Sequence, residues 1–187
     1  MAKVYEFLAT GFEEIEALIP LDIMRRAGVE FKTVSVTGAK EVESAHGGKI
    51  TADLLFEEAD LSDADLLMLP GGLPGATNLN EHVGVKKSLI EQNRKGKMIG
   101  AICAAPMVLG GIGLLRGKRA TCYPGFEKYL DEAEYTHELC TVDGNITTGE
   151  GPAATLPYAY TLLEALTDHK TADSVAEGMM FKHLMMK

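Results

Sequence analysis

The chain has 187 residues, of which 46% are hydrophobic, and a formal net charge of −9 at pH 7. This length can bury a continuous core, so we expect a single domain over residues 1–187, and the acidic balance excludes a general nucleic-acid binder. The sequence shows no leader-like start and no run of about 18 apolar residues, which predicts a cytoplasmic protein that contacts no membrane.

Strand and helix patterns alternate along the first third of the chain. The spacing predicts a strand at 4–9, then a helix that starts near Glu13 and ends at Gly28, and a second strand at 31–36. Residues 41–55 have the short alternating pattern of a β-excursion.

The same alternation continues to the C-terminus. We expect strands at 64–69, 97–102, 119–123 and 146–148, an edge strand at 139–142, and helices at 83–94, from Cys103 to about 111, at 155–166 and at 174–186. Repeated strand–helix units favour right-handed crossovers and a parallel sheet with helices on both faces. The sequence therefore predicts an α/β protein. The last helix, rich in Met, is expected to dock on the core or on a partner subunit.

One cysteine stands where an apolar strand passes into a helix. Cys103 follows the strand at 97–102 and precedes Ala104, Ala105 and Pro106. Helix-start amides favour a thiolate, and parallel sheets usually carry their chemistry at this edge. Cys103 is thus the leading candidate nucleophile.

Four segments that follow strands should meet at this edge. They are the turn with Glu13, Glu14 and Glu16, the turn at 70–72, the Cys103 junction and the turn at 149–152. A nucleophilic thiolate needs a group that handles protons and amides that face a developing oxyanion. Glu16, Gly72 and Ala104 can supply them.

Five motifs together resemble the DJ-1/ThiJ/PfpI superfamily, and its DJ-1-like branch most. They are E-E-I-E-A at 13–17, D-I-M-R-R-A-G at 22–28, L-P-G-G-L-P-G-A-T-N-L at 69–79, A-I-C-A-A-P at 101–106 and T-T-G-E-G-P at 147–152. The resemblance implies a flavodoxin-like three-layer α/β/α sandwich, a homodimer and a strained nucleophile elbow. It matches Cys103 to the nucleophile, Glu16 to the acid beside it, and Gly72 and Ala104 to the amide donors.

The chain departs from family patterns at several positions. Tyr123 stands where many relatives place a histidine, which leaves proton transfer to Glu16. Glu150 stands where some relatives have arginine, which disfavours a strongly anionic substrate. Residue 104 is alanine and not the histidine of the peptidase-like branch, so an intracellular peptidase is the weaker alternative. By resemblance Arg26 and His46 lie near the dimer contact, and relatives often have arginine at the position that His46 occupies in this chain.

The resemblance implies two functions. One is a cysteine-dependent glyoxalase or deglycase that acts on a small 2-oxoaldehyde or on a glycated protein. The other is an oxidative-stress sensor or redox-regulated chaperone that uses oxidation of Cys103.

We expect neither a cofactor nor a metal. Gly117-Lys118-Arg119 lacks the flanking residues of a phosphate loop, and His137 to Cys140 is at most half of a metal site. Cys122 and Cys140 are expected to have structural roles.

Overall fold

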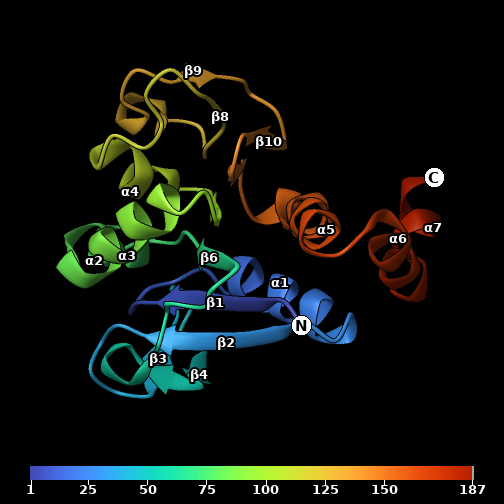
Figure 1. Ribbon diagram of the computed structural model, residues 1–187, viewed down its shortest axis with the longest axis horizontal. Helices are drawn as coiled ribbons and strands as arrows, with labels where there is room; N and C mark the ends of the chain where they lie inside the picture. The colour runs from blue at the N-terminus through green and yellow to red at the C-terminus, as the bar shows by residue number, and fades with distance from the viewer. Residues whose placement is uncertain (187) are drawn as a thin grey trace.

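The computed structural model describes residues 1–186 and is built on a seven-stranded sheet (Figure 1). The strand order is β10-β11-β7-β6-β1-β2-β5. These strands are β1 Lys3–Leu8, β2 Glu30–Ser35, β5 Leu54–Leu55, β6 Leu66–Leu69, β7 Met98–Ile102, β10 Cys140–Asp143 and β11 Ile146–Gly149. Every neighbouring pair is parallel except β10–β11 at the edge. The predicted α/β class with a mostly parallel sheet is confirmed.

Helices cover both faces of this sheet. On one side lie α1 Glu14–Arg26, α5 Thr155–Leu166 and α6 His169–Gly178, and on the other lie α2 Gly75–Glu81, α3 Val83–Arg94 and α4 Pro106–Gly111 (Figure 1). Each face has its own apolar cluster. The architecture is the expected three-layer sandwich.

The central strands consist mainly of consecutive apolar residues because helices cover both faces of the sheet. All four residues of β6 are buried, and so are the last five of β1. Glu6 of β1 is the exception in this pattern, since it carries a carboxyl group and is nevertheless fully buried.

Three predictions need correction. The single helix expected at 174–186 is α6 followed by α7 Phe181–Met185, because Met180 adopts a left-handed conformation with φ 60° and breaks the helix. The docking of this segment holds only in part: Met179 and Phe181 pack against the core, whereas Leu184 is 61% exposed.

The strand expected at 119–123 is only β8 Arg119–Ala120, which pairs with β9 Glu134–Tyr135 outside the main sheet. Helix α2 was not anticipated. Three short 3₁₀ turns, η1 Phe56–Glu58, η2 Glu127–Tyr129 and η3 Pro152–Ala154, complete the elements.

The β-excursion is a hairpin of β3 Glu41–Glu43 and β4 Lys49–Thr51. Its inward residue Val42 is 1% exposed. The amide of Ala45 donates to the carbonyl of Phe12 over 2.8 Å. The hairpin loop therefore lies beside the N-terminus of α1.

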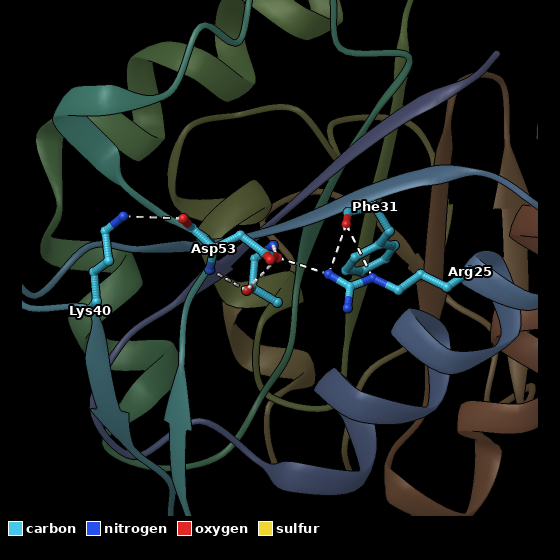
Figure 2. Close-up of polar contacts among 5 residues, drawn as sticks. Arg25, Phe31, Lys40 and Asp53 are labelled. Carbon is cyan, nitrogen blue, oxygen red and sulfur yellow. Dashed lines mark hydrogen bonds and ion pairs between the residues drawn. The ribbon is translucent and has the colours of Figure 1, made fainter.

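Asp53 ties this excursion to α1 and β2 (Figure 2). Its Oδ2 accepts from the amide of Thr33 at 2.8 Å and from its hydroxyl at 3.0 Å, and it pairs with Arg25 at 2.9 Å. Lys40 also donates to the Asp53 carbonyl, at 3.3 Å. One carboxylate thus fixes three segments.

Replacing Asp53 by Ala is expected to lower the free energy of unfolding by about 2 kcal/mol, because the buried Thr33 amide loses its acceptor. Asp53→Asn keeps an acceptor and should cost about half as much. Chemical denaturation measures both changes. As a matched control, Glu41→Ala removes an exposed ion pair with Lys49 and should stay within about 0.5 kcal/mol of the parent protein. Equal losses in all three variants would contradict the assignment.

Candidate active site

Cys103 occupies a strained turn between β7 and α4. Its φ is 63°, a conformation that non-glycine residues rarely adopt and that costs about 1–3 kcal/mol. Two backbone hydrogen bonds hold it there: its amide donates to Gly149 at 2.9 Å, and its carbonyl accepts from Tyr123 at 2.8 Å. The side chain is only 8% exposed. The turn thus fixes the sulfur at the carboxyl edge of the sheet.

Glu16 reaches the same place from the first turn of α1. Glu13 caps this helix, since its carboxylate accepts from the Glu16 amide at 2.8 Å. The Glu16 side chain is fully buried, and its Oε2 accepts from the amide of Gly71 at 2.7 Å. The cap and the Gly71 amide together orient the carboxyl group toward Cys103.

The two glycines after β6 let the backbone pass between Glu16 and Cys103. A Cβ at Gly71 would lie 2.7 Å from the Cβ of Cys103 and 2.7 Å from Oε2 of Glu16. Gly72 has φ 83°, and a Cβ there would lie 2.5 Å from the Glu13 amide nitrogen. Neither position has room for a side chain.

Burial dominates the electrostatics of this pair. It raises the pKa of Glu16 to about 7, against hydrogen bonds with Cys103 and Gly71 that lower it. Burial, followed by the Glu16 charge and hydrogen bond, also raises the pKa of the Cys103 thiol, and the amides of Gly72 and Ala104 lower it. The amides at the junction favour the thiolate, as expected from the sequence, but burial and Glu16 outweigh them. A thiolate needs its proton to move to Glu16.

A cavity of about 300 Å³ opens onto the cysteine. It is lined by Glu13, Ala45, His46, Gly72, Leu73, Cys103, Ala104, Tyr123 and Phe126. Glu150 lies instead in a neighbouring cavity of similar size, and Tyr123 lines both. Of the predicted pocket residues, Tyr123 thus lines the cavity that contains Cys103, whereas Glu150 lines only the neighbouring cavity.

Sequence reasoning missed Gly71, which is the amide donor to Glu16. The two adjacent glycines at 71–72 are typical of a backbone that passes close to other groups, but the sequence does not show which of their amides donates to Glu16. It also placed His46 only near a dimer contact, whereas the β3–β4 loop carries His46 to the cavity wall.

Among residues 1–186, one group of side chains brings possible metal-ligand atoms within 4.8 Å, namely Glu13, Glu14 and His46. Two of these side chains already have partners within the chain: Glu14 pairs with His46 at 2.7 Å and accepts a hydrogen bond from Ser44. We therefore assign no metal to them.

The other two cysteines lie outside the cavity. Cys122 is fully buried, and burial raises its pKa to about 12. Burial likewise raises the pKa of Cys140 to about 11. Neither cysteine lines the cavity at Cys103, and a structural role remains the expectation for both.

Replacing Gly71 by Ala is expected to reduce the reactivity of Cys103 by about 10²-fold, since the added methyl group displaces Glu16 or the sulfur. The rate of alkylation by iodoacetamide at pH 7.5 measures the change. Gly178→Ala is the matched control, because a Cβ there meets nothing within 4 Å. Parental reactivity in Gly71→Ala would show that the close approach does not position the pair.

The fold and the site together define a class of protein: a parallel α/β sandwich whose cysteine sits on a strained elbow beside a buried glutamic acid. The family model described as DJ-1/PfpI matches residues 2–165. The chain belongs to the DJ-1/PfpI family, as the sequence motifs predicted.

Named relatives support this assignment. The Parkinson disease protein 7 homolog of Danio rerio is 35% identical over 94% of this chain and 95% of its own length. A deglycase of Pyrococcus horikoshii is 31% identical over 81% of this chain and 91% of its own. Protein DJ-1 homolog B of Arabidopsis thaliana is 37% identical over 96% of this chain, which spans only 42% of that relative.

Solved structures agree with the fold. A cysteine-to-alanine mutant of a DJ-1 superfamily protein from Salmonella typhimurium superposes with a TM-score of 0.92 and 34% identity, covering 96% of this chain and 98% of the other. An oxidized DJ-1 from Toxoplasma gondii gives a TM-score of 0.92 at 32% identity, covering 96% of this chain and 98% of the other. In the described part of the chain, none of the helices has the length and apolar character needed to cross a bilayer.

Proposed function

We propose that this protein is a cysteine-dependent enzyme of the glyoxalase or deglycase type, which acts on small 2-oxoaldehydes or on early glycation adducts. The observation that carries the proposal is the pairing of Cys103, strained and facing a 300 Å³ cavity, with the buried acid Glu16. Relatives named as deglycases support the same class of chemistry.

The first step is addition of the sulfur to the aldehyde. As the thiol proton passes to Glu16, the sulfur forms a bond to the aldehyde carbon and the carbonyl π electrons move to oxygen. The amides of Gly72 and Ala104, which face the sulfur, are placed to stabilise the oxyanion. Return of the proton to that oxygen completes a hemithioacetal.

The second step moves a proton between adjacent carbons. Glu16 removes the proton from the sulfur-bearing carbon, and the neighbouring carbonyl oxygen takes up the hydroxyl proton of the hemithioacetal, which gives an enediolate. Glu16 then returns its proton to the neighbouring carbon while the oxygen on the sulfur-bearing carbon becomes the carbonyl oxygen of the thioester. A carboxyl group with a pKa near 7 suits both directions of transfer at neutral pH. The product is a thioester of a 2-hydroxy acid. Water then cleaves the C–S bond of the thioester and restores the thiol, so the overall reaction is 2-oxoaldehyde plus water giving a 2-hydroxy acid.

Reduced protein mixed with methylglyoxal is the direct test, with lactate followed by proton NMR. We expect lactate from the reduced protein and none from protein whose cysteines have been alkylated beforehand. Absence of lactate from protein with a free Cys103 thiol would overturn the enzyme proposal.

An oxidation sensor is the second candidate, and one observation favours it. The amides of Gly72 and Ala104 are placed to donate to sulfinate oxygens as well as to an oxyanion. Two equivalents of peroxide convert the thiol to a sulfinic acid and release two waters. Mass spectrometry after mild peroxide, with the modified residue mapped, should then show two added oxygens at Cys103. Modification spread over all three cysteines would contradict this role.

A further inference from the structure

A second buried carboxyl group lies behind the candidate catalytic pair. Glu6 is on β1, and its side chain has no exposure to solvent. Within residues 1–186, neither of its carboxyl oxygens has a hydrogen-bond partner. An unpaired buried polar group is costly and rare in protein cores. Packing alone therefore does not offset the cost of burying this acid without a partner.

The strand register places Glu6 on the same face of the sheet as Glu16. Glu6 lies opposite Met68 of β6, and Met68 lies opposite Gly100 of β7. Residues in one such row point to the same face of a parallel sheet. Met68 belongs to the apolar cluster that packs against α1 and α5, so Glu6 also faces these helices. Glu16 comes from the first turn of α1.

Tyr158 approaches this row from α5. It is fully buried, and a Cβ at Gly100 would lie 2.5 Å from its hydroxyl oxygen. The missing side chain of Gly100 thus makes room for the hydroxyl. Among the described residues this hydroxyl has no partner, and neither has Oε1 of Glu16. Four unpartnered oxygens therefore belong to three side chains on one face of the sheet.

Burial, assisted by the charge of Glu16, keeps Glu6 neutral. Burial, and next the charge of Glu16, raises the pKa of Glu6 well above its usual range. Burial and the charges of Cys140, Glu6 and Glu16 raise the pKa of Tyr158 in the same direction. On the β2 side, Thr33 lies opposite Glu6 and is hydrogen-bonded to Asp53.

The charge of Asp53 is in turn paired with Arg25. Glu6 and Tyr158 are consequently hydrogen-bond donors at neutral pH, and Oε1 of Glu16 is the acceptor that lacks a donor.

We propose that Glu6 is a positioning residue for the chemistry at Cys103: its neutral carboxyl group donates a hydrogen bond to Oε1 of Glu16, directly or through a bound water. Tyr158 is the next donor of the same buried cluster. The inference rests on the proposed function in one respect, that Glu16 handles the proton of Cys103. With Gly71 on one oxygen and Glu6 on the other, both oxygens of Glu16 have partners, and its carboxylate form is stabilised.

Two substitutions separate this role from simple packing. Glu6→Gln keeps a donor but cannot ionise, whereas Glu6→Leu removes the donor and keeps the volume. The pH dependence of Cys103 alkylation is expected to show an inflection near 7 in the parent protein, set by Glu16. Glu6→Leu should move this inflection up by about one pH unit, because the Glu16 carboxylate loses a donor. Glu6→Gln should leave it nearly unchanged, and Tyr158→Phe should cause a smaller upward shift than Glu6→Leu.

Infrared difference spectroscopy gives an independent readout. The carbonyl stretch of a protonated carboxylic acid should persist at pH 9 in the parent protein and disappear in both Glu6 variants. Met68→Leu, in the same row of the sheet, is the matched control and should leave the band and the inflection in place.

An unchanged inflection in a folded Glu6→Leu variant, or loss of the acid band from the parent protein by pH 9, where Glu16 is already ionised, would overturn the proposal. Failure of the proposed function shows differently, as parent protein that makes no lactate. The alkylation profile still tests Glu6 in that case.

Discussion

Replacing Cys103 by Ser is expected to reduce lactate formation from methylglyoxal by about 10⁴-fold or more, because a hydroxyl at this position is a far weaker nucleophile than a sulfur that can ionise. The turn should survive the change. Serine has nearly the same size, and the hydrogen bonds to Gly149 and from Tyr123 involve only the backbone of residue 103. The loss is measured as the rate of lactate formation, followed by proton NMR at the same concentration of parent and variant protein.

Cys122→Ser is the matched control for this variant. Cys122 is also buried and has a raised pKa, but it lines neither the cavity at Cys103 nor the one at Glu150. Its replacement should leave the rate within about twofold of the parent value, apart from any change in stability from the new buried hydroxyl. Similar losses in both variants would show that the effect comes from perturbed packing and not from a missing nucleophile.

The fold could be predicted from the sequence because its strongest signals are local. Buried strands such as β6 and β7 are short apolar runs, and α3 and α5 have apolar residues at helical spacing and lie where the sequence predicted them. The errors fall where local pattern and tertiary environment disagree. The break before Met180 follows Gly178, but the apolar residues continue at helical spacing past that glycine, and β8 pairs outside the main sheet although its sequence is that of an ordinary strand.

The sequence was sufficient to predict which residues form the site, but not the direction in which their pKa values are shifted. Motifs identified Cys103 and Glu16, and the structure brings these two side chains together. The net direction of the Cys103 pKa depends on burial, which depends on how Gly71, Glu16 and the cavity wall pack around the sulfur. No local pattern contains that information. Glu6 shows a different limit: a charged residue in an apolar strand is visible in the sequence, but its unpartnered state appears only in three dimensions.

Glu16→Gln is expected to cut turnover at pH 7.5 by about 10²–10⁴-fold, because the amide cannot take up the thiol proton. The shape should be retained, since the glutamine oxygen can still accept from the Gly71 amide, a 2.7 Å bond in the parent protein. The pH profile separates a chemical role from a structural one. Below about pH 7 the parent pair holds two protons, and as the pH rises through about 7 it loses one and becomes reactive.

In Glu16→Gln the rise near pH 7 should disappear. The charge that repels a thiolate is gone, but burial, the largest influence on Cys103, still keeps the thiol pKa above its ordinary value of 9.0. Alkylation should therefore increase only at higher pH. A profile with the same inflection in parent and variant would show that Glu16 does not share the proton of Cys103.

Stability should change in the opposite direction to activity in this variant. The folded-state pKa of Glu16 is raised from 4.5 to about 7, so the folded protein binds this proton more tightly than the unfolded chain does. The parent protein thus loses stability as the pH rises from about 4.5 to beyond 7, by up to about 3 kcal/mol at 1.36 kcal/mol per pKa unit. Glu16→Gln, which cannot ionise, should lack this loss and unfold at a higher denaturant concentration than the parent at pH 8, with little difference at pH 4.5. An inactive variant that is more stable at pH 8 would show that the buried acid is kept for its chemistry, whereas lower stability at both pH values would assign it to the packing of α1.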